Sequence, residues 1–349
     1  MNPTPPPLRT VLSRLREEGL LDDEPLATAP EAEPQSDPWY LRVLAGGGAW
    51  FAAILFLVFL FSFSAFRSDE GMLTLGLALL GAALGLHRRA RGLFPEQLAF
   101  ALSLAGQFAF LGGLGQILDW SAAVWALMIA LEAALLLLYP DPLHRFVSTL
   151  AGVAAAAAFF HALAVPDLVH ALVFGPAVGS GLLWEREARL VRSRYAGMAR
   201  PVAYGLAAGL LGALALSVMP DVEVFAVASW WPATLGLAAA LGVLAHRILA
   251  TDTPGTPPLA RALLFGSLLA VAVLTREAPG ITGALFVLTL GFHRGDRLLM
   301  GLALAFLAVF LGFFYYHLDL TLLAKSLMLI GSGVVLLVVR VALRRRPAA

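Results

Sequence analysis

The sequence predicts an all-α fold, a polytopic bundle of ten to twelve transmembrane helices with both termini in the cytoplasm. Of the 349 residues 60% are hydrophobic and only 13% are charged, too few to cover a soluble protein of this size. The basic residues are also concentrated in alternate gaps between the apolar segments. Of the 24 Lys and Arg residues, 21 lie in every second gap, whereas Arg67 and Arg276 lie in the other gaps. By the positive-inside rule, the arginine-rich gaps and both termini face the cytoplasm.

Twelve apolar segments are candidate spans, since a helix needs about 20 residues to cross the hydrocarbon core. Segments 260–274 and 280–293 are short, so they form either two spans or one re-entrant pair. Both possibilities leave the two termini on the same side. The segments lie at 43–66, 71–87, 98–118, 122–139, 146–163, 168–184, 202–219, 232–249, 260–274, 280–293, 298–316 and 321–343.

The chain divides into a tail, a bundle and a second short tail. Residues 1–38 form a cytoplasmic tail with a short amphipathic helix and an acidic, Pro-rich linker. Residues 39–343 form the transmembrane bundle, and 344–349 form a basic cytoplasmic tail. The lipid bilayer is the first partner that this composition implies. Nucleic acid is not implied, because insertion alone selects a basic inner rim.

Two polar side chains lie deep inside predicted spans. Glu132 is the eleventh residue of segment 122–139, roughly 15 Å below the outer surface, and Gln107 lies at nearly the same depth in the preceding span. Because residues 119–121 form a short connection, the two spans should be antiparallel neighbours, and we expect Glu132 and Gln107 to be hydrogen-bond partners. A buried carboxyl should be neutral there. The pair is either a structural hydrogen bond, a proton or cation site, or part of a catalytic site.

Lys325 is the only lysine of the chain and lies roughly 6 Å inside the last segment. Its side chain can snorkel to the outer headgroups or pair with Asp319. A positive charge on the outer side opposes the insertion bias of the rest of the chain, so a contact with a substrate or a partner is the alternative.

Catalytic signatures are missing from the sequence. It contains no phosphate-binding Gly-rich loop ending in Lys-Ser or Lys-Thr, no His-Glu-x-x-His helix and no Gly-x-Ser-x-Gly elbow. Cysteine is absent, which excludes disulfides and thiol chemistry. The histidines match no metal-ligand spacing. We therefore expect no catalytic residue, no cofactor and no metal.

The C-terminal fifth of the chain carries several specific motifs. They are residues 277–280, 290–295, 314–326 and 331–333, together with Arg340. In these motifs the sequence resembles a bacterial inner-membrane family, domain of unknown function 4401. The Gly-Gln-Ile at 115–117 is similar to a feature of the related family, domain of unknown function 2157. The resemblance implies a multispan plan and a small membrane-anchored partner protein with a Gly-Asp-Tyr motif, often encoded alongside. It implies no activity.

Three functions remain open. The first is a non-catalytic integral subunit or scaffold that binds the small partner through its outer face, around Tyr315, Tyr316, Asp319 and Lys325. The second is a secondary transporter with Glu132 as a proton or cation site, although the loop at 85–92 lacks the acid expected in the major-facilitator signature. The third is an enzyme acting on lipid-linked substrates. The excess of arginine over lysine is typical of GC-rich bacteria, and we expect a multi-pass protein of the bacterial cytoplasmic (inner) membrane.

Overall fold

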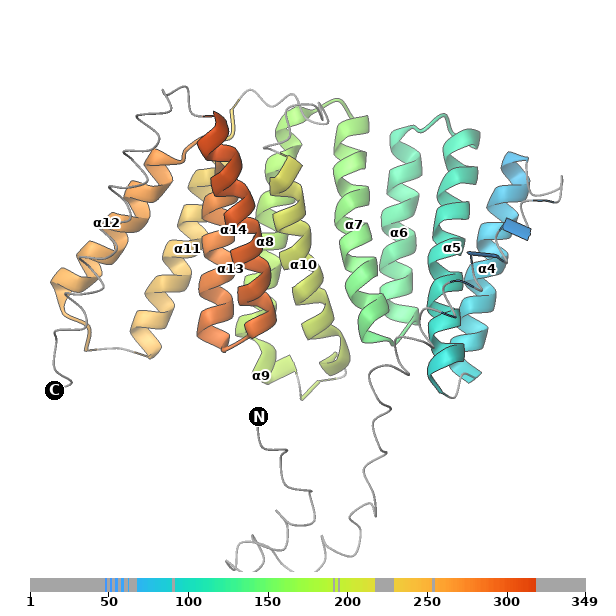
Figure 1. Cartoon of the computed structure of the whole chain (residues 1–349), viewed down its shortest axis with the longest axis horizontal. Coiled ribbons are helices and arrows are strands. Elements are labelled where there is room, and N and C mark those ends of the chain that lie inside the picture. Colours follow the sequence, from blue (N-terminus) through green and yellow to red (C-terminus); the bar gives the residue numbers. More distant parts are fainter. Residues whose placement is uncertain are drawn as a thin grey trace, which may run out of the picture.

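The computed structural model describes residues 68–89, 92–190, 192–193, 195–216, 229–252 and 255–317, with a few isolated positions between 48 and 62. Within these ranges all regular structure is helical, which confirms the all-α prediction. The helices stand side by side in a long row from α4 to α12 (Figure 1). They are α4 Asp69–Arg89, α5 Leu93–Ile117, α6 Ala122–Leu138, α7 Pro142–Ala162, a 3₁₀ turn at Pro166–Leu168, α8 Val169–Glu185, α9 Glu187–Leu190, α10 Ala196–Leu216, α11 Trp231–Thr251, α12 Pro258–Leu274, α13 Pro279–Arg294 and α14 Arg297–His317.

The predicted spans coincide with these helices wherever the chain is described. Each predicted span from 71–87 to 298–316 matches one helix, from α4 to α14 with the short α9 left out. In the described ranges, six helices are long and apolar enough to cross a membrane, and α6 and α12 are shorter apolar helices. The predicted spans 43–66 and 321–343 lie outside the continuous described ranges, as do the two predicted tails.

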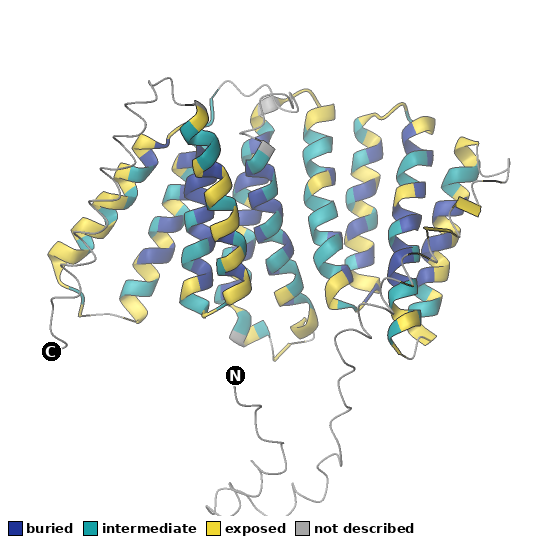
Figure 2. Ribbon diagram, in the orientation of Figure 1, coloured by how far each residue is buried: buried dark blue, intermediate teal, exposed yellow. Residues whose placement is uncertain are grey.

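Large apolar side chains cover the outside of the row. Phe108 of α5 is 73% exposed and Phe292 of α13 is 79% exposed. Exposed positions recur along α4, α6, α8, α11, α12 and α14, between buried and intermediate positions (Figure 2). A water-soluble protein rarely exposes so much contiguous apolar surface, whereas a lipid-facing helix requires it.

The helices begin and end on two opposite sides of the bundle, and these two sides differ in charge. Helices α4, α6, α8, α11 and α13 end on the side where α5, α7, α10, α12 and α14 begin, and α9 lies on this side as well (Figure 1). We call it the basic end, because among the described arginines only Arg276 lies at the opposite end. The arginines of the alternate gaps therefore lie together at one end of the helices.

Helices α12 and α13, the two short predicted spans, pack on different neighbours. Helix α12 packs chiefly on α11 at the edge of the row, whereas α13 packs on α14, α11 and α10. A re-entrant pair would pack against itself and reverse direction halfway. The arrangement therefore favours two separate helices.

One continuous apolar core joins α8, α10, α11, α13 and α14, and we call these helices the apolar region. Its fully buried side chains include Trp184, Leu210, Leu237, Leu290 and Phe310. The motif Gly280 lies against the ring of Phe310, where any Cβ would come within 2.5 Å of a ring carbon. Packing of this density holds helices together where lipid gives no hydrophobic drive.

Helices α4 to α7 form the polar region, whose buried apolar clusters are small. Helices α4 and α5 approach closely through glycines. A Cβ on Gly113 would lie 2.5 Å from the backbone nitrogen of Leu73, and one on Gly106 would lie 2.9 Å from Leu80. Helix α6 packs extensively on α7 but contacts α5 little. The polar side chains described below lie in this region.

Candidate functional site

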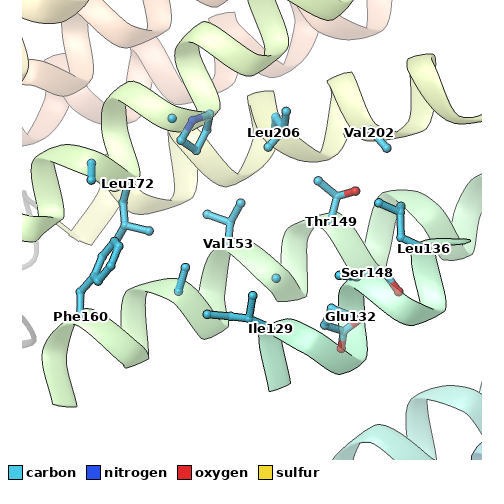
Figure 3. Close-up of a pocket in the computed structure, with 16 residues that line it drawn as sticks. Ile129, Glu132, Leu136, Ser148, Thr149, Val153, Phe160, Leu172, Val202 and Leu206 are labelled. Atoms are coloured by element: carbon cyan, nitrogen blue, oxygen red, sulfur yellow. The ribbon is translucent and has the colours of Figure 1, made fainter. Parts of the chain in front are cut away.

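Glu132 of α6 lies on the wall of a cavity between α6, α7, α8 and α10. The cavity has a volume of about 410 Å³, and most of its lining is aliphatic, including Ile129, Val153 and Leu206 (Figure 3). Glu132 itself is only 2% exposed. A carboxyl group so placed meets hardly any water, although the cavity beside it is wide enough to hold several water molecules or a small ligand.

The carboxyl group of Glu132 is not satisfied by its surroundings. Neither Oε1 nor Oε2 has a hydrogen-bond partner among the described residues. Beside it on the cavity wall is the Ser148 hydroxyl of α7 (Figure 3). Burying a polar group without a partner costs roughly 1–3 kcal/mol, and a charge costs more. The site therefore favours a neutral carboxyl or one that holds a cation.

His144 is the centre of a buried polar cluster next to this cavity. Its Nε2 lies 2.8 Å from Ser103 Oγ of α5, and its Nδ1 lies 3.3 Å from Ser148 Oγ of α7. The amide nitrogen of Gln107 donates to Ser103 at 3.5 Å. His144 is 1% exposed, and Ser103 and Ser148 are equally buried. The cluster joins α5 to α7 by side chains, and Ser148 also borders the Glu132 cavity.

The predicted hydrogen bond between Glu132 and Gln107 is wrong. Gln107 bonds to Ser103 on its own helix, and Glu132 faces α7 instead of α5. The turn between the two helices, with positive φ at Asp119 and Trp120, joins them without packing them together. The two residues nevertheless belong to one neighbourhood, because Ser103, His144 and Ser148 lie between them.

Aromatic rings cover the cluster on the side of the basic end. The ring of Tyr139 stacks on the ring of His144, with the two ring centroids 4.0 Å apart. The ring of His87 of α4 also stacks on Tyr139, with the centroids 4.1 Å apart. Phe100 packs edge-on against His144 at 5.8 Å. Tyr139 is 1% exposed, and its hydroxyl has no partner among the described residues. These rings separate His144 from the water beyond the basic end.

Sequence reasoning missed His144 because it placed the start of the span at residue 146. Helix α7 begins at Pro142, and Asp141 caps it by accepting a hydrogen bond from the His144 backbone N–H at 2.7 Å. Aspartate followed by proline is a recognised helix-start signal. Read in that way, the sequence would have placed His144 in the first turn and Ser148 one turn later.

The predicted outer-face residues are only partly described. Tyr315 and Tyr316 form the last turn of α14, their rings 5.8 Å apart and nearly perpendicular. Tyr316 is 79% exposed, whereas Tyr315 is half-buried. Asp319 and Lys325 lie outside the described residues, so their contacts stay a prediction.

Two of the specific sequence motifs have structural roles at helix ends. The carboxylate of Glu277 accepts hydrogen bonds from the backbone of Trp230 at 2.9 Å and from Ser229, at the start of α11. In residues 290–295, Gly295 ends α13 in the left-handed conformation, with φ 65°. The next residue, Asp296, caps α14 by accepting from Leu299 N–H at 2.9 Å, and it also accepts from the Tyr204 hydroxyl. Within the described ranges no three His, Asp or Glu side chains gather as a metal site would need.

The fold and the buried polar cluster define a multi-pass helical membrane protein with an unsatisfied carboxyl group inside its bundle. Residues 38–346 match the family described as domain of unknown function (DUF4401). The match covers most of the chain, so the protein belongs to this family, as the sequence motifs predicted. No curated protein and no solved structure matches the chain.

Proposed function

We propose that this protein is a membrane carrier in which Glu132 alternately binds a proton and a cation. The observation that carries the proposal is the Glu132 carboxyl, 2% exposed and without a hydrogen-bond partner in the described structure, on the wall of a cavity of about 410 Å³. Ionisable side chains inside a bilayer are expensive, and they commonly mark the path of an ion or a substrate.

The surroundings of Glu132 support this function. The cavity is bounded by four helices and is almost wholly apolar apart from Glu132, Ser148 and Thr149. A carboxylate in such a cavity gains strongly from one bound cation, because few other groups compete for its charge. Glu132 lies ten residues from one end of α6 and six from the other, which places it about 9–15 Å from either end.

The test is a flux measurement on proteoliposomes that contain a trapped pH-sensitive dye. Gradients of Na⁺, K⁺ and tetramethylammonium are imposed one at a time. We expect one of them to drive proton movement with the wild-type protein and not with Glu132→Gln. The matched control is Glu70→Gln, which changes an exposed acid in the first turn of α4. Equal fluxes from wild type, Glu132→Gln and empty liposomes for all three cations would reject the proposal.

A second candidate function is the binding of a small membrane-anchored partner protein at the end of α14. The observation that favours it is Tyr316, a large aromatic side chain that is 79% exposed in the last turn of α14, within the family-like residues 314–326. Exposed tyrosines are frequent anchors of protein interfaces. In this function the chain is a non-catalytic integral subunit, and Lys325 supplies a positive charge for an acid of the partner.

Co-purification from native membranes tests this second function. The wild type is compared with Lys325→Leu, Lys325→Arg and Tyr316→Ala at matched expression. We expect one partner in stoichiometric amount with the wild type, a retained partner with Lys325→Arg, and at least a tenfold loss, about 1.4 kcal/mol, with the other two variants. Full retention of the partner by all three variants would exclude this surface.

We also propose that the basic end faces the cytoplasm of a bacterial inner membrane, which places both termini inside. The excess of arginine at this end supports the orientation. Because the chain has no cysteine, single-cysteine variants give a clean test. An impermeant thiol reagent added to intact cells should label Asp167→Cys but not Ser193→Cys. The reverse pattern would invert the topology.

A further inference from the structure

A second titratable group, His144, lies near Glu132, with the hydroxyl of Ser148 between the two. Ser148 borders the cavity beside the carboxyl, and on its other side its Oγ is 3.3 Å from His144 Nδ1. Ser148 and His144 are one turn apart on α7, so the helix itself fixes their separation. The order Glu132, Ser148, His144 thus runs from the cavity towards the basic end.

The remaining ring nitrogen of His144 is also engaged. Its Nε2 lies 2.8 Å from Ser103 Oγ, so in the tautomer protonated at Nε2 the ring donates to Ser103 and accepts at Nδ1 from Ser148. That tautomer leaves Nδ1 free to take up a second proton.

We propose that His144 receives the proton of Glu132 through the hydroxyl of Ser148 when a cation occupies the cavity. The inference rests on the proposed carrier function. In this step the Ser148 hydroxyl gives its proton to His144 Nδ1 and takes the proton from the Glu132 carboxyl. Glu132 becomes a carboxylate that balances the cation, and His144 becomes an imidazolium. The carboxyl reaches Ser148 by rotating or through one water, for which the cavity has room.

Among the described residues, few charged or titratable groups lie around His144. Asp141 caps the helix on which His144 lies and places a carboxylate next to it. Tyr139 stacks on the ring, with His87 of α4 behind it and Glu96 of α5 near the Tyr139 hydroxyl. Helices α8 and α10 contribute no titratable group to the cavity wall. Asp141 is thus the neighbouring carboxylate that would balance an imidazolium, whereas burial and His87 oppose one, so the ring rests neutral and is open to a proton.

Infrared spectroscopy of the purified protein in nanodiscs tests the path without knowledge of the ligand. The carbonyl band of protonated Glu132 is identified by its loss in Glu132→Gln, and its downshift after a switch to D₂O buffer measures proton access. We expect the exchange to slow at least about tenfold in both His144→Gln and Ser148→Ala. Glutamine keeps polar groups for Ser103 and Ser148, so this variant also separates proton transfer from simple folding.

Two matched variants serve as controls. His161→Gln changes a histidine at the far end of the same helix, and Ser180→Ala removes a buried hydroxyl of α8 that bonds only within its own helix turn. Both should exchange at the wild-type rate. If His144→Gln and Ser148→Ala also exchange at that rate, His144 is not the acceptor, while the flux test of Glu132 stands unaffected. If no Glu132 band exists at any pH, there is no proton to pass on and the path is rejected.

Discussion

The apolar region and the polar region are built from helices of similar length, yet they bury different side chains. In the apolar region, Leu210, Leu237 and Phe310 are wholly buried in one continuous core. In the polar region the buried set includes Ser103, Gln107, Glu132, His144 and Ser148, and the apolar clusters are small. Buried polar groups add little to stability inside a membrane. The difference indicates that the apolar region holds the bundle together and that the polar region keeps groups that stability does not require.

The largest effect should come from removing a ring of the apolar core. Phe310→Ala leaves a cavity between α13 and α14, and we expect a loss of about 3–5 kcal/mol in unfolding free energy. Thermal unfolding in detergent, followed by tryptophan fluorescence, measures the change. Leu304→Ala on the exposed face of the same helix is the control and should have little effect. Equal losses for both variants would contradict the assignment of the core.

A smaller effect is expected where α4 and α5 touch. The added Cβ of Gly113→Ala would meet the backbone of Leu73 at 2.5 Å, so the helices must separate. We expect a loss of about 1–3 kcal/mol. The control is Gly81→Ala, whose Cβ would have no neighbour within 4 Å. The polar region would be more tolerant than we propose if both variants unfolded at the same temperature.

One tyrosine in each region allows a direct comparison of the two. Tyr204 of α10 donates its hydroxyl hydrogen to Asp296, whereas the Tyr139 hydroxyl has no partner in the described structure. Replacing Tyr204 with phenylalanine should cost about 1–2 kcal/mol, because Asp296 loses a donor. The same change at Tyr139 keeps the stack on His144 and should alter stability by less than about 0.5 kcal/mol. A larger loss at Tyr139 would reveal a bond that its hydroxyl makes.

The smallest change in stability is expected at the most unusual residue. Glu132→Gln replaces a carboxyl that has no hydrogen-bond partner in the described ranges with an amide of nearly the same shape. We expect the unfolding free energy to change by less than about 0.5 kcal/mol while the cation-driven proton flux is lost. A collapse in stability together with the loss of flux would instead make Glu132 a structural residue.

The positions of the helices were predictable because hydropathy is a local property. Every span predicted between 71 and 316 coincides with a helix, and the arginines in alternate gaps mark one basic end. The caps were less well predicted. The start of α7 was placed four residues late, and the error removed His144 from consideration, although Asp141 and Pro142 carried the signal.

By itself, the sequence determined the family, the all-α fold and the depth of Glu132 in its helix. Only the tertiary structure decided that Glu132 faces Ser148 on α7 and not Gln107 on α5. The reason is physical. In water, an apolar stripe shows which face of a helix is buried, but in lipid all faces are apolar and the stripe disappears. Partner helices are then chosen by the close fit of side chains and glycines, which no local pattern in the sequence reveals.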